Sequence, residues 1–117
     1  MWRMHTNATV NLDPNNPTSA TLVIGQQSLQ MQILSPTSGV KFETMDANRL
    51  PTDPPLPAGA QDSPNPTVTV VVINLPAGTY NIQVLFNPQW PGMSASDFVT
   101  PPSVALSSWS LTSHNSN

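Results

Sequence analysis

The sequence contains no cysteine and very few charged residues. The absence of cysteine excludes disulfide bonds and thiolate metal sites. Only 8% of the residues are charged, against about 25% in a typical soluble domain. The three cations, Arg3, Lys41 and Arg49, are scattered along the chain, and the formal net charge is −3. Nucleic-acid binding needs several cations to replace the counterions of the phosphates, so this class of function is excluded.

Long apolar stretches are missing as well. No run of about 18 apolar residues, the length that a membrane-spanning helix requires, occurs in the sequence. The opening MWRMHT lacks the apolar core of a signal peptide. The surface polarity must come from Ser, Thr, Asn and Gln, which suits an extracellular protein or a face that rests against another domain. If the parent protein is secreted, we expect its targeting segment to lie outside this chain.

The length and the apolar content predict a single domain over residues 1–117. The chain has 117 residues, of which 38% are hydrophobic. This is the size of one ordinary domain, and it is large enough for one modest core. A domain of this size buries roughly two-thirds of the surface that its unfolded chain exposes.

Apolar and polar residues alternate with a period of two, which predicts β-strands. A first strand is predicted over residues 2–10 and a short one over residues 40–44. Between them, residues 19–24 and 28–34 alternate on either side of Gly25-Gln26-Gln27 and predict a hairpin. The predicted inward face of the first strand carries Trp2, Met4, Ala8 and Val10.

Residues 50–66 interrupt this pattern with six prolines. Proline cannot donate the hydrogen bonds of a sheet interior. A linker between two domains is the alternative interpretation, but neither flank is large enough for a core of its own. We therefore expect a proline-rich loop within the single domain.

The second half of the chain predicts three more strands. Residues 67–75 (TVTVVVINL) are apolar on both faces, as in a strand that is buried on both sides. Pro76 and Gly78 favour a tight turn, so residues 79–86 are predicted to return beside this strand as a second hairpin. Residues 87–102 form a predicted loop and residues 103–111 a last strand. Six or seven strands without a helical stretch predict an all-β fold, an antiparallel β-sandwich.

Histidine and serine give little support for catalysis. His5 and His114 lie at opposite ends of the chain, and no serine has the glycine pattern of an activated nucleophile. His114 is predicted to be a solvated residue of a polar tail. His5 lies on the outward face of the first strand and is a candidate contributor to the cleft of a larger active site.

The carboxylates also favour structural roles over chemical ones. Glycoside hydrolysis requires a pair of carboxylates at a defined separation. Asp53 and Asp62 lack the Asp-x-Asp spacing that supports a calcium site. The sequence therefore predicts no catalytic residue, no metal site and no cofactor. The acidic residues, which fall almost entirely in predicted turns, are Asp13, Glu43, Asp46, Asp53, Asp62 and Asp97.

Trp90 is the strongest candidate for contact with a carbohydrate or a partner. It lies in the loop NPQWPG, where proline holds the backbone rigidly. Trp2, Tyr80 and Trp109 fall on apolar faces and are predicted to be core residues. Asn7 begins the tripeptide NAT, an N-glycosylation sequon that matters in a secreted eukaryotic protein.

Several segments together resemble the C-terminal β-sheet region of heparinase II/III-like polysaccharide lyases. They are the opening WRMHT, the hairpin over residues 19–34 with Phe42 after it, the segment LPAGTY at 75–80, and WSL at 109–111. The resemblance implies a parent enzyme that cleaves acidic polysaccharides by β-elimination. In that family a helical toroid precedes β-sandwich layers. The catalytic base and acid of that family belong mainly to the toroid, and nothing in this chain matches the toroid. The scarcity of Arg and Lys also departs from a surface that binds acidic sugars.

The resemblance implies a non-catalytic module that supports the helical catalytic domain of the same extracellular parent chain. Because the pattern of the first strand begins at Met1, we expect a strand edge or apolar face that missing sequence covers. Two alternatives remain open. One is an independent carbohydrate-binding module that uses Trp90, and the other is an adhesive or structural sandwich that acts through protein–protein contact.

Overall fold

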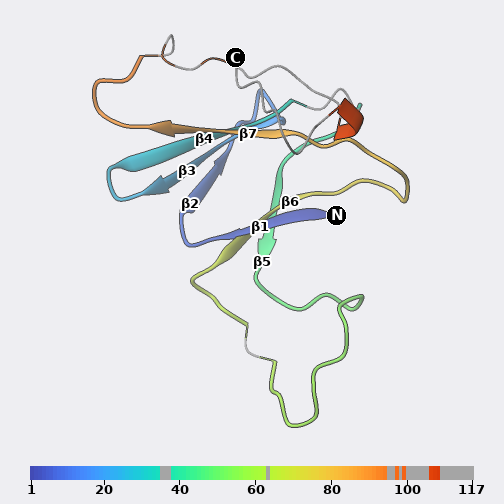
Figure 1. Cartoon of the computed structure of the whole chain (residues 1–117). Helices are drawn as coiled ribbons and strands as arrows, with labels where there is room; N and C mark the ends of the chain where they lie inside the picture. Colours follow the sequence, from blue (N-terminus) through green and yellow to red (C-terminus); the bar gives the residue numbers. More distant parts are fainter. Residues whose placement is uncertain (35–37, 63, 95–96, 98, 100–105, 109–117) are drawn as a thin grey trace.

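The computed structural model describes residues 1–34, 38–62, 64–94, 97, 99 and 106–108. Within these residues, seven strands form two antiparallel sheets (Figure 1). The three-stranded sheet has the order β1 (Trp2–Thr6), β6 (Thr69–Ile73), β5 (Glu43–Asp46). The four-stranded sheet has the order β2 (Thr9–Leu12), β3 (Ser19–Ile24), β4 (Gln27–Ile33), β7 (Val84–Gln89). The all-β antiparallel sandwich predicted from the sequence is therefore confirmed.

The hydrophobic core lies between the two sheets. Its largest fully buried side chains are Met31 of β4 and the β6 residues Val71 and Ile73. Burial of such side chains is the main favourable contribution to folding. The core cluster consists of Ala8, Ala20, Leu22, Met31, Ile33, Val40, Phe42, Val71 and Ile73.

The predicted first strand, residues 2–10, is divided between the two sheets. β1 pairs with β6 in one sheet and β2 pairs with β3 in the other. At the crossing, the backbone N–H of Ala8 donates a hydrogen bond to Thr6 Oγ1 over 3.1 Å. Ala8 itself is buried in the core. The inward side chains of β1 and β2 face the same core. The alternation of apolar and polar residues therefore continues through the change of sheet, and the sequence does not show where the first strand ends.

The first predicted hairpin is confirmed as β3 and β4. The last pair of the ladder is Ile24 with Gln27, which leaves the two-residue turn Gly25-Gln26. Gly25 has a φ of 57°, a value that a residue with a side chain rarely adopts. Glycine at the first position of a two-residue turn is typical of tight hairpins.

The second predicted hairpin is wrong. β6 pairs with β1 and β5, whereas β7 pairs with β4 in the other sheet. Residues 74–83 therefore connect the two sheets rather than two neighbouring strands. The backbone N–H of Leu34 donates to the carbonyl of Gln83 over 2.9 Å where this connection reaches the four-stranded sheet. Alternation shows which face a strand buries but not which strand lies beside it.

The three-stranded sheet covers only the middle of the four-stranded sheet. One inward row across the four strands consists of Leu12, Ala20, Met31 and Phe86. The two central members are 1% and 0% exposed, whereas Leu12 and Phe86 on the edge strands are 40% and 41% exposed. Two apolar edges of the sandwich are consequently open to solvent.

The predicted strand over residues 40–44 is displaced toward the C-terminus. Val40 and Phe42 are buried in the core but precede the strand, which begins at Glu43 and continues to Asp46. The backbone N–H of Phe42 donates instead to the carbonyl of Pro17 over 2.9 Å. This bond ties the segment to the start of β3.

The proline-rich residues 50–66 contain no strand or helix in their described part. They connect β5 and β6, which are neighbours in the three-stranded sheet. The loop projects away from both sheets (Figure 1). Of the predicted last strand, residues 103–111, only residues 106–108 are described, and they form the 3-10 turn η2 (Leu106–Ser108) rather than a strand. Trp109 and His114 lie outside the described residues.

Candidate functional site

The outward face of the three-stranded sheet carries His5. This residue is exposed on β1 and is paired with Val70 of β6, which has Met45 of β5 on its other side. Arg3 and Glu43 flank Val72 in the same way. No group of three or more His, Asp or Glu side chains that could hold a metal ion occurs among the residues the structure describes.

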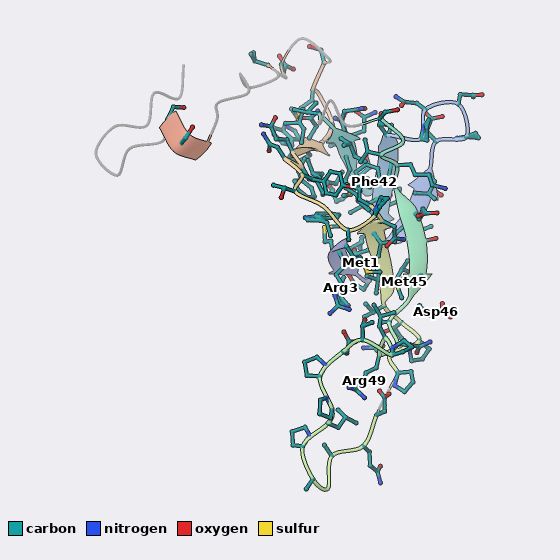
Figure 2. The ribbon with its side chains drawn as sticks, turned by 90° about the vertical axis from the view of Figure 1, so that its right-hand side faces the viewer. Met1, Arg3, Phe42, Met45, Asp46 and Arg49 are labelled. Atoms are coloured by element: carbon teal, nitrogen blue, oxygen red, sulfur yellow. The ribbon has the colours of Figure 1, made fainter. Side chains whose placement is uncertain are left out.

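Asp53 anchors the proline-rich loop to β1. Its carboxylate accepts the backbone N–H of Leu50 over 2.8 Å and pairs with Arg3 over 3.3 Å. Arg49 donates to the carbonyl oxygens of Asp53 and Pro54. The bond from Leu50 and the charge of Arg3 hold the pKa of Asp53 below its ordinary value. Figure 2 shows Arg3 above Arg49, which lies where the loop leaves the sheet.

Three other described carboxylates also have local structural contacts. Asp13 accepts backbone N–H groups of Asn15 and Asn16, and Asp97 accepts that of Ser94. Bonds of this kind stabilise turns. Glu43 pairs with Lys41 over 3.0 Å and accepts a hydrogen bond from Asn74, and both contacts lower its pKa. These contacts organise turns and strand ends, and they do not assemble a pair of facing carboxylates.

Trp90 is 54% exposed and directly follows the edge strand β7. The backbone N–H of Met93 donates to the carbonyl of Trp90 over 3.2 Å, and Gly92 has a φ of 91°. Proline followed by a glycine of positive φ defines a type II turn, so the backbone that carries Trp90 is stiff. Phe86 and Pro88, both exposed on the inward side of β7, precede it. We call Phe86, Pro88 and Trp90 the aromatic edge.

Phe86 was not singled out from the sequence as a surface residue. It shares a parity with Ile82 and Val84, which pack against the core. Only the limited extent of the facing sheet leaves Phe86 exposed. The available signal was its place directly before the segment NPQWPG, whose two prolines indicate that the strand is near its end.

A pocket of about 400 Å³, lined mostly by apolar residues, lies beside the start of β1. Its floor is Ile73, which is fully buried, and its rim includes Met1 and Tyr80, which are 63% and 38% exposed. The prediction of Tyr80 as a core residue is wrong, because its segment has left the sheet at residue 74 and its side chain is exposed. Trp2 is half-buried and packs against the core. We call the surface formed by Met1, Trp2, Ile73, Leu75, Pro76, Ala77, Gly78, Tyr80 and Ile82 the N-terminal pocket.

Gly78 has a specific role in the shape of this pocket. A Cβ atom at this position would lie 3.0 Å from both Cζ and Oη of Tyr80. Such a distance is shorter than an ordinary carbon contact of 3.5 Å or more. The missing side chain therefore lets the tyrosine ring lie against the backbone.

Asn7 is exposed at the crossing between β1 and β2, and Thr9 of the same sequon is exposed at the start of β2. The sequon is thus accessible in the folded chain.

Among the described residues, no helix is long and apolar enough to cross a membrane. Comparison of the sequence with models of known protein families finds no match, and comparison with curated proteins finds no significant similarity.

Proposed function

We propose that this chain is a non-catalytic β-sandwich module of a heparinase II/III-like polysaccharide lyase, and that the helical catalytic domain of the parent covers the N-terminal pocket. The observation that carries the proposal is the pocket itself. Met1, Trp2 and Tyr80 expose apolar surface around a buried floor, and no charged side chain lines the pocket.

The residue types of the N-terminal pocket suit a protein partner. The cores of protein interfaces are enriched in aromatic residues and methionine and depleted in charged residues. A partner side chain that enters the pocket would contact Met1 and the ring of Tyr80, which are the exposed members of its lining.

Coexpression tests this role. The chain carries an affinity tag and is expressed with the helical toroid of a heparinase II/III-like lyase, and we expect the two to elute together. Tyr80→Glu places a charge on the rim and is expected to abolish co-elution. Ile24→Glu is the matched control, because Ile24 is 55% exposed at the β3–β4 turn and does not line the pocket. Co-elution that survives Tyr80→Glu, or a folded chain that never associates, contradicts the proposal.

A second candidate function is glycan binding by the module alone, favoured by the aromatic edge. Trp90 and Phe86 expose large rings beside one edge strand, and aromatic rings stack on the C–H faces of sugars. Pro88 removes one backbone donor from this edge, which protects it against pairing with another strand. Affinity electrophoresis in gels that contain soluble polysaccharides tests this function. Retardation that Trp90→Ala abolishes supports this contact, and retardation that is unchanged contradicts it.

A further inference from the structure

The outward face of the four-stranded sheet has an unusual composition. Pairing in register places eleven side chains on this face, and nine of them are Ser, Thr, Asn or Gln. None is charged and none is buried. The outward face of the other sheet, by contrast, carries Arg3, His5 and Glu43. We call the following set the polar face: Thr9, Asn11, Ser19, Thr21, Val23, Ser28, Gln30, Gln32, Leu85, Asn87 and Gln89.

The polar face is arranged in rows that cross the strands. In the central row, Asn11 is paired with Thr21, Thr21 with Gln30, and Gln30 with Asn87. Neighbouring strands are about 4.8 Å apart, so this row spans roughly 14 Å. Within the part of the chain that the structure describes, the side chains of these four residues form no hydrogen bond. Gln32, in the next row, is already engaged by Thr18 over 2.8 Å.

These properties select the class of ligand. Side-chain amides and hydroxyls offer both donors and acceptors, which match the hydroxyl groups of sugars. Recognition of an acidic polymer relies on Arg or Lys, and the polar face has neither. Val23 and Leu85 add small apolar contacts on which the C–H groups of a sugar could rest.

A protein partner fits this face less well. Protein interfaces are depleted in serine and rely on aromatic, methionine and arginine side chains. Each polar group that a rigid apolar partner covered would lose its water without a replacement bond. A hydrated, hydroxyl-rich chain instead supplies a bond to each side chain.

We propose that the polar face binds an uncharged polysaccharide, with the central row of Asn11, Thr21, Gln30 and Asn87 donating and accepting its hydrogen bonds. The proposal names a site distinct from the N-terminal pocket and does not rest on docking to a helical domain. It gives the second candidate function a different location, because Trp90 and Phe86 lie outside the central row.

Affinity electrophoresis of the full chain tests the site. The gels contain hydroxyethylcellulose, mixed-linkage β-glucan or galactomannan as neutral polymers, and alginate as the acidic one. We expect retardation by at least one neutral polymer and none by alginate. The double variant Asn11→Ala/Gln30→Ala is expected to raise the dissociation constant about tenfold, which corresponds to about 1.4 kcal/mol. Gln27→Ala is the matched control, because this exposed glutamine belongs to the same strand as Gln30 but has the opposite parity.

Each other outcome of this experiment overturns the proposal. Retardation that Trp90→Ala abolishes and the double variant leaves unchanged assigns glycan binding to the aromatic edge. Retardation by alginate alone contradicts the uncharged class of ligand. No retardation by any polymer, together with a dimer in sedimentation that Gln30→Arg dissociates, makes the polar face a protein interface. Circular dichroism of the variants checks that each one is folded, which separates a lost contact from a lost fold.

Discussion

Ile73 and Ile24 allow the position of the core to be tested with one chemical change. Ile73 is 0% exposed at the end of β6, whereas Ile24 is 55% exposed at the end of β3. Replacing either residue with alanine removes the same atoms. Only at Ile73 does the change leave a cavity among packed side chains, so the two variants separate burial from the chemistry of the substitution.

The expected magnitudes differ clearly. A buried Ile→Ala substitution costs about 2–5 kcal/mol of unfolding free energy, whereas a substitution on an exposed surface changes it by about 0.5 kcal/mol. With a urea dependence of about 2 kcal/mol per molar, Ile73→Ala lowers the urea midpoint by about 1–2.5 M. A domain has a total stability of about 5–15 kcal/mol, so the variant remains folded in water unless the module lies at the lower end of that range.

Urea unfolding followed by circular dichroism and by tryptophan fluorescence measures both variants. Trp2 is the direct cross-strand partner of Ile73, so its emission reports on this part of the core. If Ile73→Ala costs no more than Ile24→Ala, then residue 73 does not lie in a packed core, and the assignment of β6 as the buried centre of the three-stranded sheet is wrong.

Two further substitutions test local features. The NMR chemical shift of the Leu50 amide proton should change with pH as the carboxylate of Asp53 takes up a proton, because this N–H donates to that carboxylate. The midpoint of the change should lie below the ordinary pKa of aspartate, since the pKa of Asp53 is lowered in the fold. The contacts of Asp53 are therefore complete at neutral pH and are lost as the pH falls through that lowered value. Asp53→Asn should remove the pH dependence of the Leu50 chemical shift and speed proteolysis within residues 50–66. A pH dependence that is unchanged in the variant would refute the contact. Gly78→Ala should shift the ring resonances of Tyr80 in NMR spectra, since the new Cβ would lie 3.0 Å from the ring. Unchanged resonances would show that the ring does not lie against this glycine.

The sequence predicted local elements well because their signals are local. The β3–β4 hairpin needed only two alternating runs and Gly25 between them. The apolar residues on both parities of β6 indicated burial on both faces, and Val70 and Val72 on its outward side are indeed 3% and 1% exposed. These two residues are flanked within the sheet by side chains of β1 and β5.

Pairing between distant strands could not be predicted in the same way. Residues 79–86 alternate as well as any strand, yet the partner of β7 is β4, which lies about fifty residues earlier in the chain. The exposure of Phe86 and Tyr80 depends on how far the opposite sheet extends, and no local pattern carries that information. For the same reason the polar face was hidden: Asn11, Gln30 and Asn87 form a row only once the register of four strands is known.

The fold separates three kinds of surface: a charged surface, the uncharged polar face and the N-terminal pocket. The low overall charge of the sequence does not reveal this separation. Charged side chains gather on the outward side of the three-stranded sheet and at the base of the proline-rich loop, whereas the polar face carries none. The N-terminal pocket and the polar face share no residue. Occupation of one therefore engages none of the residues of the other, and we expect a module that is docked through the pocket still to present Asn11 and Gln30 to a glycan. Retardation by a neutral polysaccharide that persists in the complex with a helical domain would fit this arrangement, whereas mutual exclusion of the two partners would show that the surfaces are not independent.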